Sequence, residues 1–301
     1  MVFFVKRMIA LFRPFYLLGG FLLYALGAGI AHYLGRATDW HVYLLGQAVV
    51  TLLQLGTLFL DEYFVSLSAL PGPIHRAEGQ PHNDEPFHLG RWPSLLGSAT
   101  VLTMGTFFTL QLIRAGDIHL EALTILIVAF LIAIFYATPP VQLNHSGFGE
   151  LADAIFLANL VPAFAFLLQA GFFHRLLAMT TFPLTLLYLA MALALTLPTY
   201  AEDIKQNKRV LMVRLGWQRG MNWHNLLILC GFLLIGLAMI SGLPWKLGWP
   251  TFLALPVGLF QIWQMVQIRS GARPRYRLLV VTAVATFALV AYLFTFTFWI
   301  S

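Results

Sequence analysis

Long apolar runs constrain this chain more than any other feature of its sequence. A helix that crosses a bilayer needs about 20 mostly apolar residues. Runs of that kind recur nine times, at residues 8–34, 41–60, 93–113, 119–137, 151–170, 177–198, 223–242, 249–268 and 278–299. Lipid offers no water to satisfy an open backbone, so each run is expected to be helical. The sequence therefore predicts an all-α polytopic membrane protein with nine transmembrane helices, forming a single domain over residues 1–301.

Composition excludes several classes of protein. Of the 301 residues, 59% are hydrophobic and only 10% are charged, whereas soluble domains carry about 25% charged residues. A soluble enzyme and a disordered chain are therefore excluded. The net charge of +6 does not indicate a nucleic-acid partner, because the basic residues lie in short segments between the apolar runs.

The basic residues are distributed unequally between the two sides of the predicted bundle. If the N-terminus is cytoplasmic, 14 of the 18 Lys and Arg residues fall on the cytoplasmic side. The other four are Arg36, Arg114, Arg175 and Lys246. This positive-inside bias predicts a cytoplasmic N-terminus and a C-terminus outside, in a cell membrane. The first run is interpreted as a retained helix, since no small-residue cleavage site follows it.

Acidic residues show the same asymmetry. Nine of the 12 Asp and Glu residues fall on the predicted cytoplasmic side, several of them at helix ends. No predicted helix carries a charge near its midplane, where ion-coupled transporters place ionisable groups. A small-molecule or lipid transporter is therefore a weaker alternative than chemistry at the cytoplasmic membrane face.

Two long cytoplasmic loops are predicted, at about 61–92 and 199–222, and each opens with an acid pair. The pairs are Asp61-Glu62 and Glu202-Asp203. Converging carboxylates of this kind would hold Mg²⁺, which commonly bridges one or two carboxylates to a substrate phosphate. Lys208, Arg209 and Arg214 follow the second pair and would bind a diphosphate. The alternative is that these are ordinary charges at helix ends.

Three segments resemble the UbiA superfamily of intramembrane prenyltransferases. Arg13-Pro14 resembles the entry of that family's first helix. The stretch from Tyr136 to Glu150, YATPPVQLNHSGFGE, resembles its Y-x-x-P-P-x-x-L…G-x-G-[ED] segment, most closely in the branch that prenylates 1,4-dihydroxy-2-naphthoate in menaquinone synthesis. Lys208 to Gly216, KRVLMVRLG, resembles its G-K-R-T-L-x-V-R-L-G segment. The resemblance implies a UbiA-like bundle of nine helices.

The resemblance also implies two aspartate-rich motifs, and each has lost an acid here. Counting back from Lys208 places Asp203 on the last acid of the second motif and Thr199 on the first. In the first motif two registers stay open. With Asp61 central, the flanking positions hold Thr57 and Val65, and with Glu62 central they hold Leu58 and Ser66. Glu78, Asp84 and Glu85 are further candidate ligands in the first loop.

The function implied by the resemblance is transfer of a prenyl group from an allylic polyprenyl diphosphate to an aromatic, quinone-precursor-like acceptor, with Mg²⁺. Asp61 and Asp203 are the implied catalytic acids, with Glu62 and Glu202 as further metal ligands. Lys208, Arg209 and Arg214 would bind the diphosphate, and Tyr136 and Tyr200 would contact the acceptor or stabilise a cation. The thinned motifs leave open a non-catalytic relative that binds prenyl lipids.

Some polar residues have structural interpretations. Gln47, Gln54 and Asp61 recur every seven residues and are expected, like Asn159, to face the bundle interior. Gly27-Ala28-Gly29 is expected to allow close helix packing. His75, His82 and His88 lack the spacing of a metal site and are interpreted as surface residues.

Overall fold

The structure, a computed structural model, describes residues 14–68, 90–205 and 208–301. These residues form nine helices long and apolar enough to cross a membrane, with no strand among them. Their sequence is α2 (Pro14–Tyr33), α3 (Trp40–Ser68), α4 (Arg91–Ala115), α5 (Leu120–Ala137), the span of α7 (Gly149–Ile155) and α8 (Val161–Ala170), α9 (Arg175–Thr196), α12 (Trp217–Ile240), the span of α13 (Trp245–Gly248) and α14 (Leu255–Arg269), and α15 (Tyr276–Ile300). The predicted all-α fold is confirmed.

Two spans contain a change of helix type. A π-helical segment, η1 (Phe156–Leu160), joins α7 to α8 just before Pro162, which has no N–H to donate to the helix ladder. A 3₁₀ segment, η2 (Trp249–Ala254), joins α13 to α14. Within η1, Asn159 donates a hydrogen bond to the Thr185 hydroxyl of α9. This contact with α9 confirms the prediction that Asn159 faces the bundle interior.

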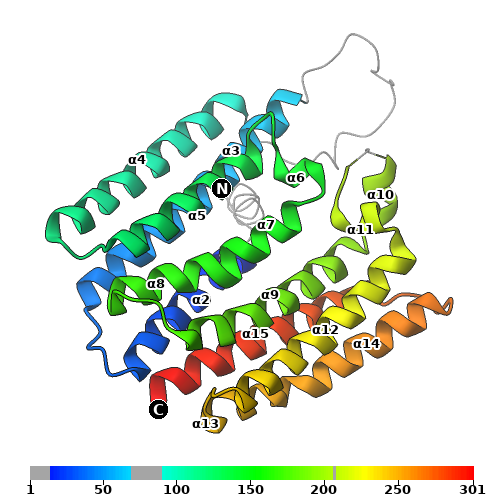
Figure 1. Cartoon of the computed structure of the whole chain (residues 1–301). Coiled ribbons are helices and arrows are strands. Elements are labelled where there is room, and N and C mark those ends of the chain that lie inside the picture. The colour runs from blue at the N-terminus through cyan, green and yellow to red at the C-terminus, as the bar shows by residue number, and fades with distance from the viewer. Residues whose placement is uncertain (1–13, 69–89, 206–207) are drawn as a thin grey trace, which may run out of the picture.

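The helices differ in how deeply they are packed. The Gly149–Ala170 span is 78% buried, while the α4 span is only 11% buried. Figure 1 accordingly shows α4 at the edge of the bundle beside α3, with α2, α8 and α9 more central. Gly27 explains the closeness of α2 to α8, because a Cβ there would lie 2.0 Å from the Pro162 carbonyl oxygen.

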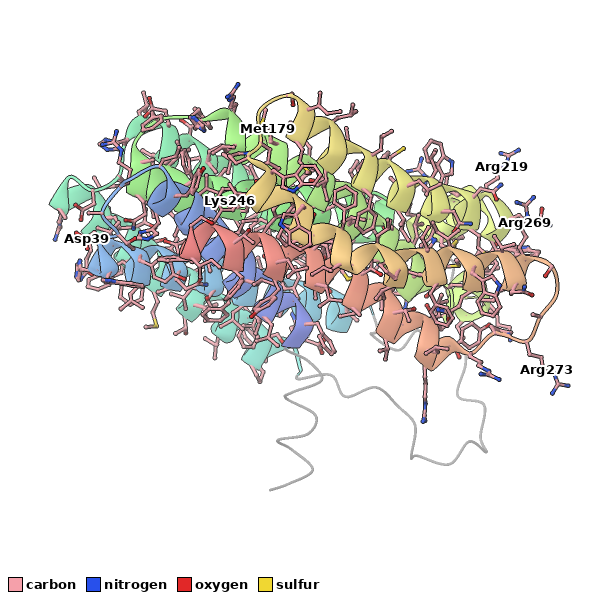
Figure 2. The ribbon with its side chains drawn as sticks, turned by 90° about the horizontal axis from the view of Figure 1, so that it is seen from below. Asp39, Met179, Arg219, Lys246, Arg269 and Arg273 are labelled. Carbon is pink, nitrogen blue, oxygen red and sulfur yellow. The ribbon has the colours of Figure 1, made fainter. Side chains whose placement is uncertain are left out.

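The ends of the bundle differ in charge. Figure 2 shows Arg219, Arg269 and Arg273 at one end of the bundle and Asp39 at the other. We call the first of these the basic end. The C-terminal end of α3 and three short helices also lie there, namely α6 (Leu143–Ser146), α10 (Tyr200–Lys205) and α11 (Leu211–Leu215) (Figure 1). The basic end is the side predicted to be cytoplasmic.

The structure corrects the predicted loop boundaries at the basic end. Helix α3 continues to Ser68, so Asp61 and Glu62 lie on a helix rather than at the start of a loop. The segment predicted as a loop over 199–222 contains α10 and α11, and α12 already begins at Trp217. Polar residues at these helix ends hid the boundaries, because the helices project beyond the apolar runs that were counted.

Several predicted features lie outside the described residues. These are Arg13, the three histidines His75, His82 and His88, and the acids Glu78, Asp84 and Glu85. Within the described part of the chain, Gln47 and Gln54 are buried, as the heptad spacing predicted. The Gln54 amide donates to the Tyr16 carbonyl of α2 at 2.9 Å.

Candidate functional site

The first acid pair contributes Asp61 to a cluster assembled from four helices. The half-buried Asp61 carboxylate on α3 accepts a hydrogen bond from Asn144 Nδ2 of α6 at 2.9 Å. The Tyr136 hydroxyl at the end of α5 donates to Asp153 Oδ2 of α7 at 3.1 Å and lies 3.4 Å from Asn144 Oδ1. We call Asp61, Tyr136, Asn144 and Asp153 the Asp61 cluster.

Hydrogen bonds in this cluster fix the direction of each polar group. Asn144 uses its amide nitrogen on Asp61, which leaves its oxygen facing the Tyr136 hydroxyl. A chain of hydrogen bonds in a partly buried setting orients its members more firmly than isolated pairs do. Glu62 follows Asp61 on the same helix and therefore projects about 100° away from it. Asp61 is thus the acid that this network positions.

The second acid pair contributes Asp203, and its partners are local. The Thr199 hydroxyl donates to Asp203 Oδ2 at 2.7 Å, and Lys208 Nζ lies 3.8 Å from Asp203 Oδ1. The Lys208 backbone N–H also donates to the Asp203 carbonyl at 2.9 Å. Asp203 is buried, while its neighbour Glu202 is exposed. We call Thr199, Asp203 and Lys208 the Asp203 cluster.

One segment, from Tyr136 to Asp153, connects the two clusters. At its start it supplies Tyr136 and Asn144 to the Asp61 cluster. Further along, Glu150 Oε1 accepts the Leu211 backbone N–H at 3.0 Å, within the segment from Lys208 to Arg214 that we call the basic run. Glu150 also lies close enough to Asp203 for their negative charges to repel. Acid pairs 140 residues apart in sequence are thereby held at the same end of the bundle.

Gly147 of this segment permits its contact with the basic run. Gly147 has a φ of +80°, and a Cβ there would lie 2.2 Å from Arg214 Cδ and 2.5 Å from the Arg209 carbonyl oxygen. The Arg214 guanidinium stacks 4.5 Å from the centre of the Phe148 ring, and its Nη1 donates to the Ser146 carbonyl at 3.4 Å. A side chain at position 147 would separate the two segments, so glycine is required there.

The predicted site residues divide into three groups. Asp61, Tyr136, Asp203 and Lys208 belong to the two clusters. Arg209 and Arg214 are exposed beside them, on the basic run. Glu202 is exposed, and Tyr200 packs in part against the apolar residues around Leu193 and Met212.

Sequence reasoning missed four site residues: Asn144, Glu150, Asp153 and Thr199. Asn144 and Glu150 lie within the stretch that carries the family resemblance, and Asp153 lies just beyond it. Thr199 occupies the place of the lost acid in the second motif, and the structure shows that it instead donates a hydrogen bond to the remaining acid. The spacing of four residues between Thr199 and Asp203 was the available signal, because such residues share a helix face.

The carboxylates of the two clusters are oxygen ligands of the kind that Mg²⁺ prefers. Among the residues that the structure describes, no three Asp, Glu, His or Cys side chains form a group that could hold a metal ion. Mg²⁺ does not need such a cage, because it prefers oxygen ligands and commonly takes one or two carboxylates together with substrate phosphates and water. Asp61 and Asp203 each provide a carboxylate, which is a ligand of this type.

Comparison with known proteins gives a match in structure but not in sequence. No protein-family model matches the chain, and no curated protein matches its sequence. Among solved structures, a UbiA homolog from Archaeoglobus fulgidus bound to GPP and Mg²⁺ is 15% identical, with a TM-score of 0.63 over 98% of this chain and 100% of that one.

Two further structures of a UbiA homolog from the same organism are similar to this chain. The one bound to Cd²⁺ has a TM-score of 0.61, at 15% identity over 94% of this chain and 99% of that one. The one bound to DMAPP and Mg²⁺ has a TM-score of 0.57, at 15% identity over 95% of this chain and 97% of that one. The chain therefore has the fold of these UbiA homologs.

Proposed function

We propose that this protein is a Mg²⁺-dependent prenyltransferase that moves a prenyl group from an allylic polyprenyl diphosphate to an aromatic acceptor within the membrane. The observation that carries the proposal is the joining of the Asp61 and Asp203 clusters at the basic end, beside Lys208, Arg209 and Arg214. The fold of this protein also supports the proposal, because a UbiA homolog with a similar fold has been solved bound to GPP and Mg²⁺ and bound to DMAPP and Mg²⁺.

Each group of residues has a role in binding the donor. Lys208 and Arg209 are exposed on the basic run and would bind the diphosphate oxygens, with Arg214 held beside them by Phe148 and Ser146. Asp61 and Asp203 would hold Mg²⁺ against the same diphosphate. When bound, Mg²⁺ supplies positive charge that offsets the charge of the departing diphosphate.

The reaction itself is a substitution at the allylic carbon. The bond between this carbon and the diphosphate oxygen breaks. The diphosphate keeps the electron pair and would be bound by Lys208 and Arg209. A ring carbon of the electron-rich acceptor forms the new C–C bond, and the ring then loses a proton. Tyr136 is anchored through its hydroxyl in the Asp61 cluster, so its ring has a fixed place from which to stabilise the allylic cation. Tyr200 is the second candidate for this role.

The acceptor and the orientation complete the proposal. A quinone precursor of the 1,4-dihydroxy-2-naphthoate type is the proposed acceptor, because the Tyr136–Glu150 stretch most resembles that branch.

Residues 1–301 would act as one domain, with the basic end in the cytoplasm and the C-terminus outside. Reporter fusions after Lys205 and after Ser301 test the orientation, since they should report the cytoplasm and the outside respectively. If both report one side, the orientation is wrong.

A transfer assay tests the activity. Purified protein is incubated with radiolabelled geranylgeranyl diphosphate, MgCl₂ and a panel of dihydroxynaphthoate and hydroxybenzoate acceptors. We expect a labelled, lipid-soluble product with one acceptor class, and no product after EDTA treatment. Binding of the donor without any transfer to the panel would contradict the proposal.

A second candidate is a protein that binds prenyl diphosphates without transferring them. The observation in its favour is that Thr199 stands where the resemblance implies an acid, while Lys208 already pairs with Asp203. Such a protein would bind the donor in the same assay but would not release diphosphate from it, even over long incubation.

A further inference from the structure

A polar pocket of about 160 Å³ lies near the start of α12, and none of its lining residues belongs to either acid cluster. It is lined by Arg219, Asn222, Trp223 and Leu226, whose spacing of three and four residues places them on one face of the helix. Arg269 of α14 reaches the same place, because its guanidinium donates a hydrogen bond to the Asn222 side-chain oxygen. Figure 2 shows Arg219 and Arg269 at the basic end. Two helices thus bring two arginines to one pocket.

The polar groups at this pocket are hydrogen-bond donors. Arg269 occupies the oxygen of the Asn222 amide, which leaves the amide nitrogen to donate. Arg219 and Arg269 present guanidinium groups, and Trp223 presents an indole N–H. Among the residues that the structure describes, neither arginine is paired with a carboxylate. The pocket is therefore complementary to an anion with several oxygen atoms, such as a phosphate group.

The last third of the sequence contains no acid that could neutralise these arginines. No Asp or Glu occurs between residues 204 and 301, whereas ten Lys and Arg residues do. They are Lys205, Lys208, Arg209, Arg214, Arg219, Lys246, Arg269, Arg273, Arg275 and Arg277. A ligand that carries an ammonium group beside its phosphate would find no carboxylate on α12 or α14 to pair with it. The pocket therefore favours an anion without such a group.

Exposed leucines continue from the pocket along the same face of α12. Leu226, Leu229, Leu233 and Leu237 are between 47% and 61% exposed, and their spacing keeps them in one stripe. From Leu226 to Leu237 the stripe is about 16 Å long, at 1.5 Å per helical residue. That length is close to half of the roughly 30 Å hydrocarbon core of a bilayer. Donors at one end and an apolar stripe one leaflet deep match the shape of a phospholipid.

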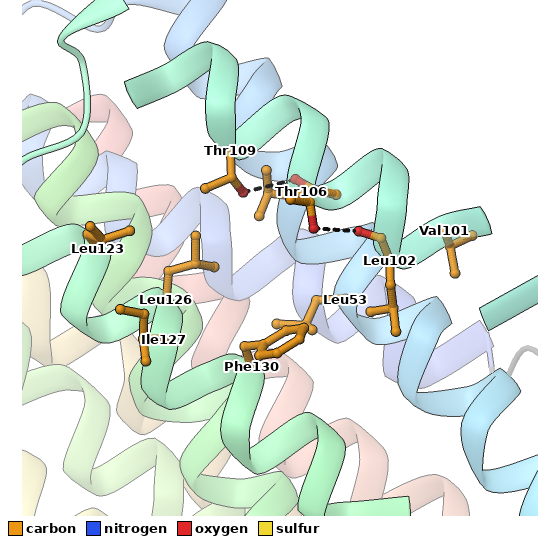
Figure 3. Close-up of a pocket in the computed structure, with 11 residues that line it drawn as sticks. Leu53, Val101, Leu102, Thr106, Thr109, Leu123, Leu126, Ile127 and Phe130 are labelled. Atoms are coloured by element: carbon orange, nitrogen blue, oxygen red, sulfur yellow. Dashed lines mark hydrogen bonds between the residues drawn. The ribbon is translucent and has the colours of Figure 1, made fainter. Parts of the chain in front are cut away.

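A larger groove of about 210 Å³, between α3, α4 and α5, has no such group of donors. Figure 3 shows the mainly aliphatic side chains around it. The Thr106 and Thr109 hydroxyls in its wall donate to carbonyls of their own helix, each at 2.9 Å, as the dashed lines mark. Neither hydroxyl is left to hold a headgroup. Of these two pockets, only the one on α12 joins cationic donors to an apolar stripe.

We propose that the α12 pocket binds the phosphate of an anionic phospholipid whose headgroup carries no ammonium group, such as phosphatidylglycerol. Arg219, Arg269 and Asn222 donate to the phosphate oxygens, as basic pockets between transmembrane helices do for anionic headgroups. The Trp223 ring lies at the level of the membrane interface, and an acyl chain packs along residues 226–237. The proposal does not depend on the proposed function, because it involves neither donor nor acceptor.

Lipid titration followed by native mass spectrometry tests the proposal. Delipidated protein in detergent is titrated with phosphatidylglycerol and, separately, with phosphatidylethanolamine that carries the same acyl chains. The pocket variant combines Arg219→Gln with Arg269→Gln. The matched control combines Arg273→Gln with Arg275→Gln, because these arginines are also exposed and their loss removes the same charge outside the pocket.

The expected result is a preference that depends on the two pocket arginines. Wild type should bind phosphatidylglycerol roughly tenfold more tightly than phosphatidylethanolamine, and the pocket variant should lose most of that difference. The control variant should stay close to wild type. Equal losses in the two double variants would assign the binding to general positive potential and overturn the pocket. The absence of any preference in wild type would overturn the proposal as well.

Competition and photolabelling separate a lipid from a free phosphate. Inorganic phosphate and glycerophosphoglycerol offer the same oxygens without acyl chains, so neither should displace phosphatidylglycerol at millimolar concentrations. Displacement by either would overturn the assignment to a lipid. A phosphatidylglycerol analogue with a diazirine in its acyl chain should label residues 226–237 of the wild-type protein, and excess phosphatidylglycerol should prevent the labelling. Labelling confined to other helices would contradict the proposal without reference to any variant.

Discussion

The Asp61 and Asp203 clusters each contain one acid of the two predicted pairs, at the same end of the bundle, but they are built differently. Asp61 accepts a hydrogen bond from the neutral amide of Asn144, which comes from a helix 83 residues away. Asp203 accepts from Thr199, four residues earlier, and pairs with the cationic Lys208. The first acid thus depends on tertiary structure for its position, and the second depends on its own local segment.

This difference separates the expected roles of the two acids. Lys208 is about half exposed and lies 3.8 Å from Asp203. An ion pair of that kind contributes at most about 1 kcal/mol, so Lys208 can turn toward a diphosphate at little cost. Asp203 thus holds Lys208 close to the place where the substrate would bind. Under the proposed function, Asp61, which the Tyr136–Asp153 segment orients, would supply the other carboxylate.

The largest predicted effect comes from replacing Asp203. Asp203→Asn should reduce turnover by roughly 10²–10³-fold, the size of effect seen when one charge-stabilising group is lost from an active site. Glu202→Gln is the control, because Glu202 is exposed next to it and should retain most activity. Both variants are compared at saturating donor and MgCl₂. Similar losses in the two would indicate a general need for negative charge and contradict the distinction between them.

The next largest effect is expected at Asn144. Asn144→Ala removes the donor that orients Asp61 and should lower turnover about 10–100-fold, as loss of a residue behind a metal ligand commonly does. The MgCl₂ concentration for half-maximal rate should rise with it. His145→Ala, at the exposed neighbouring position, should leave both quantities unchanged. A wild-type Mg²⁺ requirement in Asn144→Ala would show that the Asp61 network has no part in metal binding.

A smaller effect, on donor affinity, is expected in the basic run. Arg209→Ala should raise the KM for the donor by roughly tenfold, because one charge-assisted contact to phosphate is lost. Arg219→Ala serves as the comparison, since Arg219 is exposed at the same end but outside the basic run. If the two variants raise KM equally, the run contributes only general positive potential at the membrane surface.

The smallest effect is expected from a substitution that restores the acid that the resemblance implies at position 199 of the second motif. Thr199→Asp places a second carboxylate on the helix face of Asp203, so the half-maximal MgCl₂ concentration should fall a few-fold. Ala201→Asp adds the same charge on a different face and should not change it. A higher Mg²⁺ requirement in Thr199→Asp would mean that the Thr199 hydroxyl bond to Asp203 is itself needed for metal binding.

The fold could be predicted because each transmembrane span must by itself be long and apolar enough to cross the bilayer. Run length and apolar content alone located nine helices, and the heptad spacing of Gln47 and Gln54 placed both correctly in the interior. The ends of the helices could not be located in this way. Asp61 and Glu62 interrupt the apolar run but not the helix, since α3 continues for two turns beyond Leu60.

The site was only partly predictable, and the difference between the clusters explains why. Thr199, Asp203 and Lys208 lie within ten residues of one another, so their association is local in sequence. The contact of Asn144 with Asp61 depends on how α6 folds back over the end of α3. No local pattern encodes such a contact. The amide was therefore missed, although the stretch that contains it had been singled out.

Joint action of the two clusters on one Mg²⁺–diphosphate complex is the central claim, and a double-mutant cycle of donor binding tests it most directly. Affinity for geranylgeranyl diphosphate is measured with and without MgCl₂ in wild type, Asp61→Asn, Asp203→Asn and the double variant. If both acids hold one complex, each single variant should lose most of the Mg²⁺-dependent affinity, and the double variant should be scarcely weaker than either. If Asp61→Asn binds the donor as wild type does, or if the two losses simply add, the clusters act separately and the account is wrong.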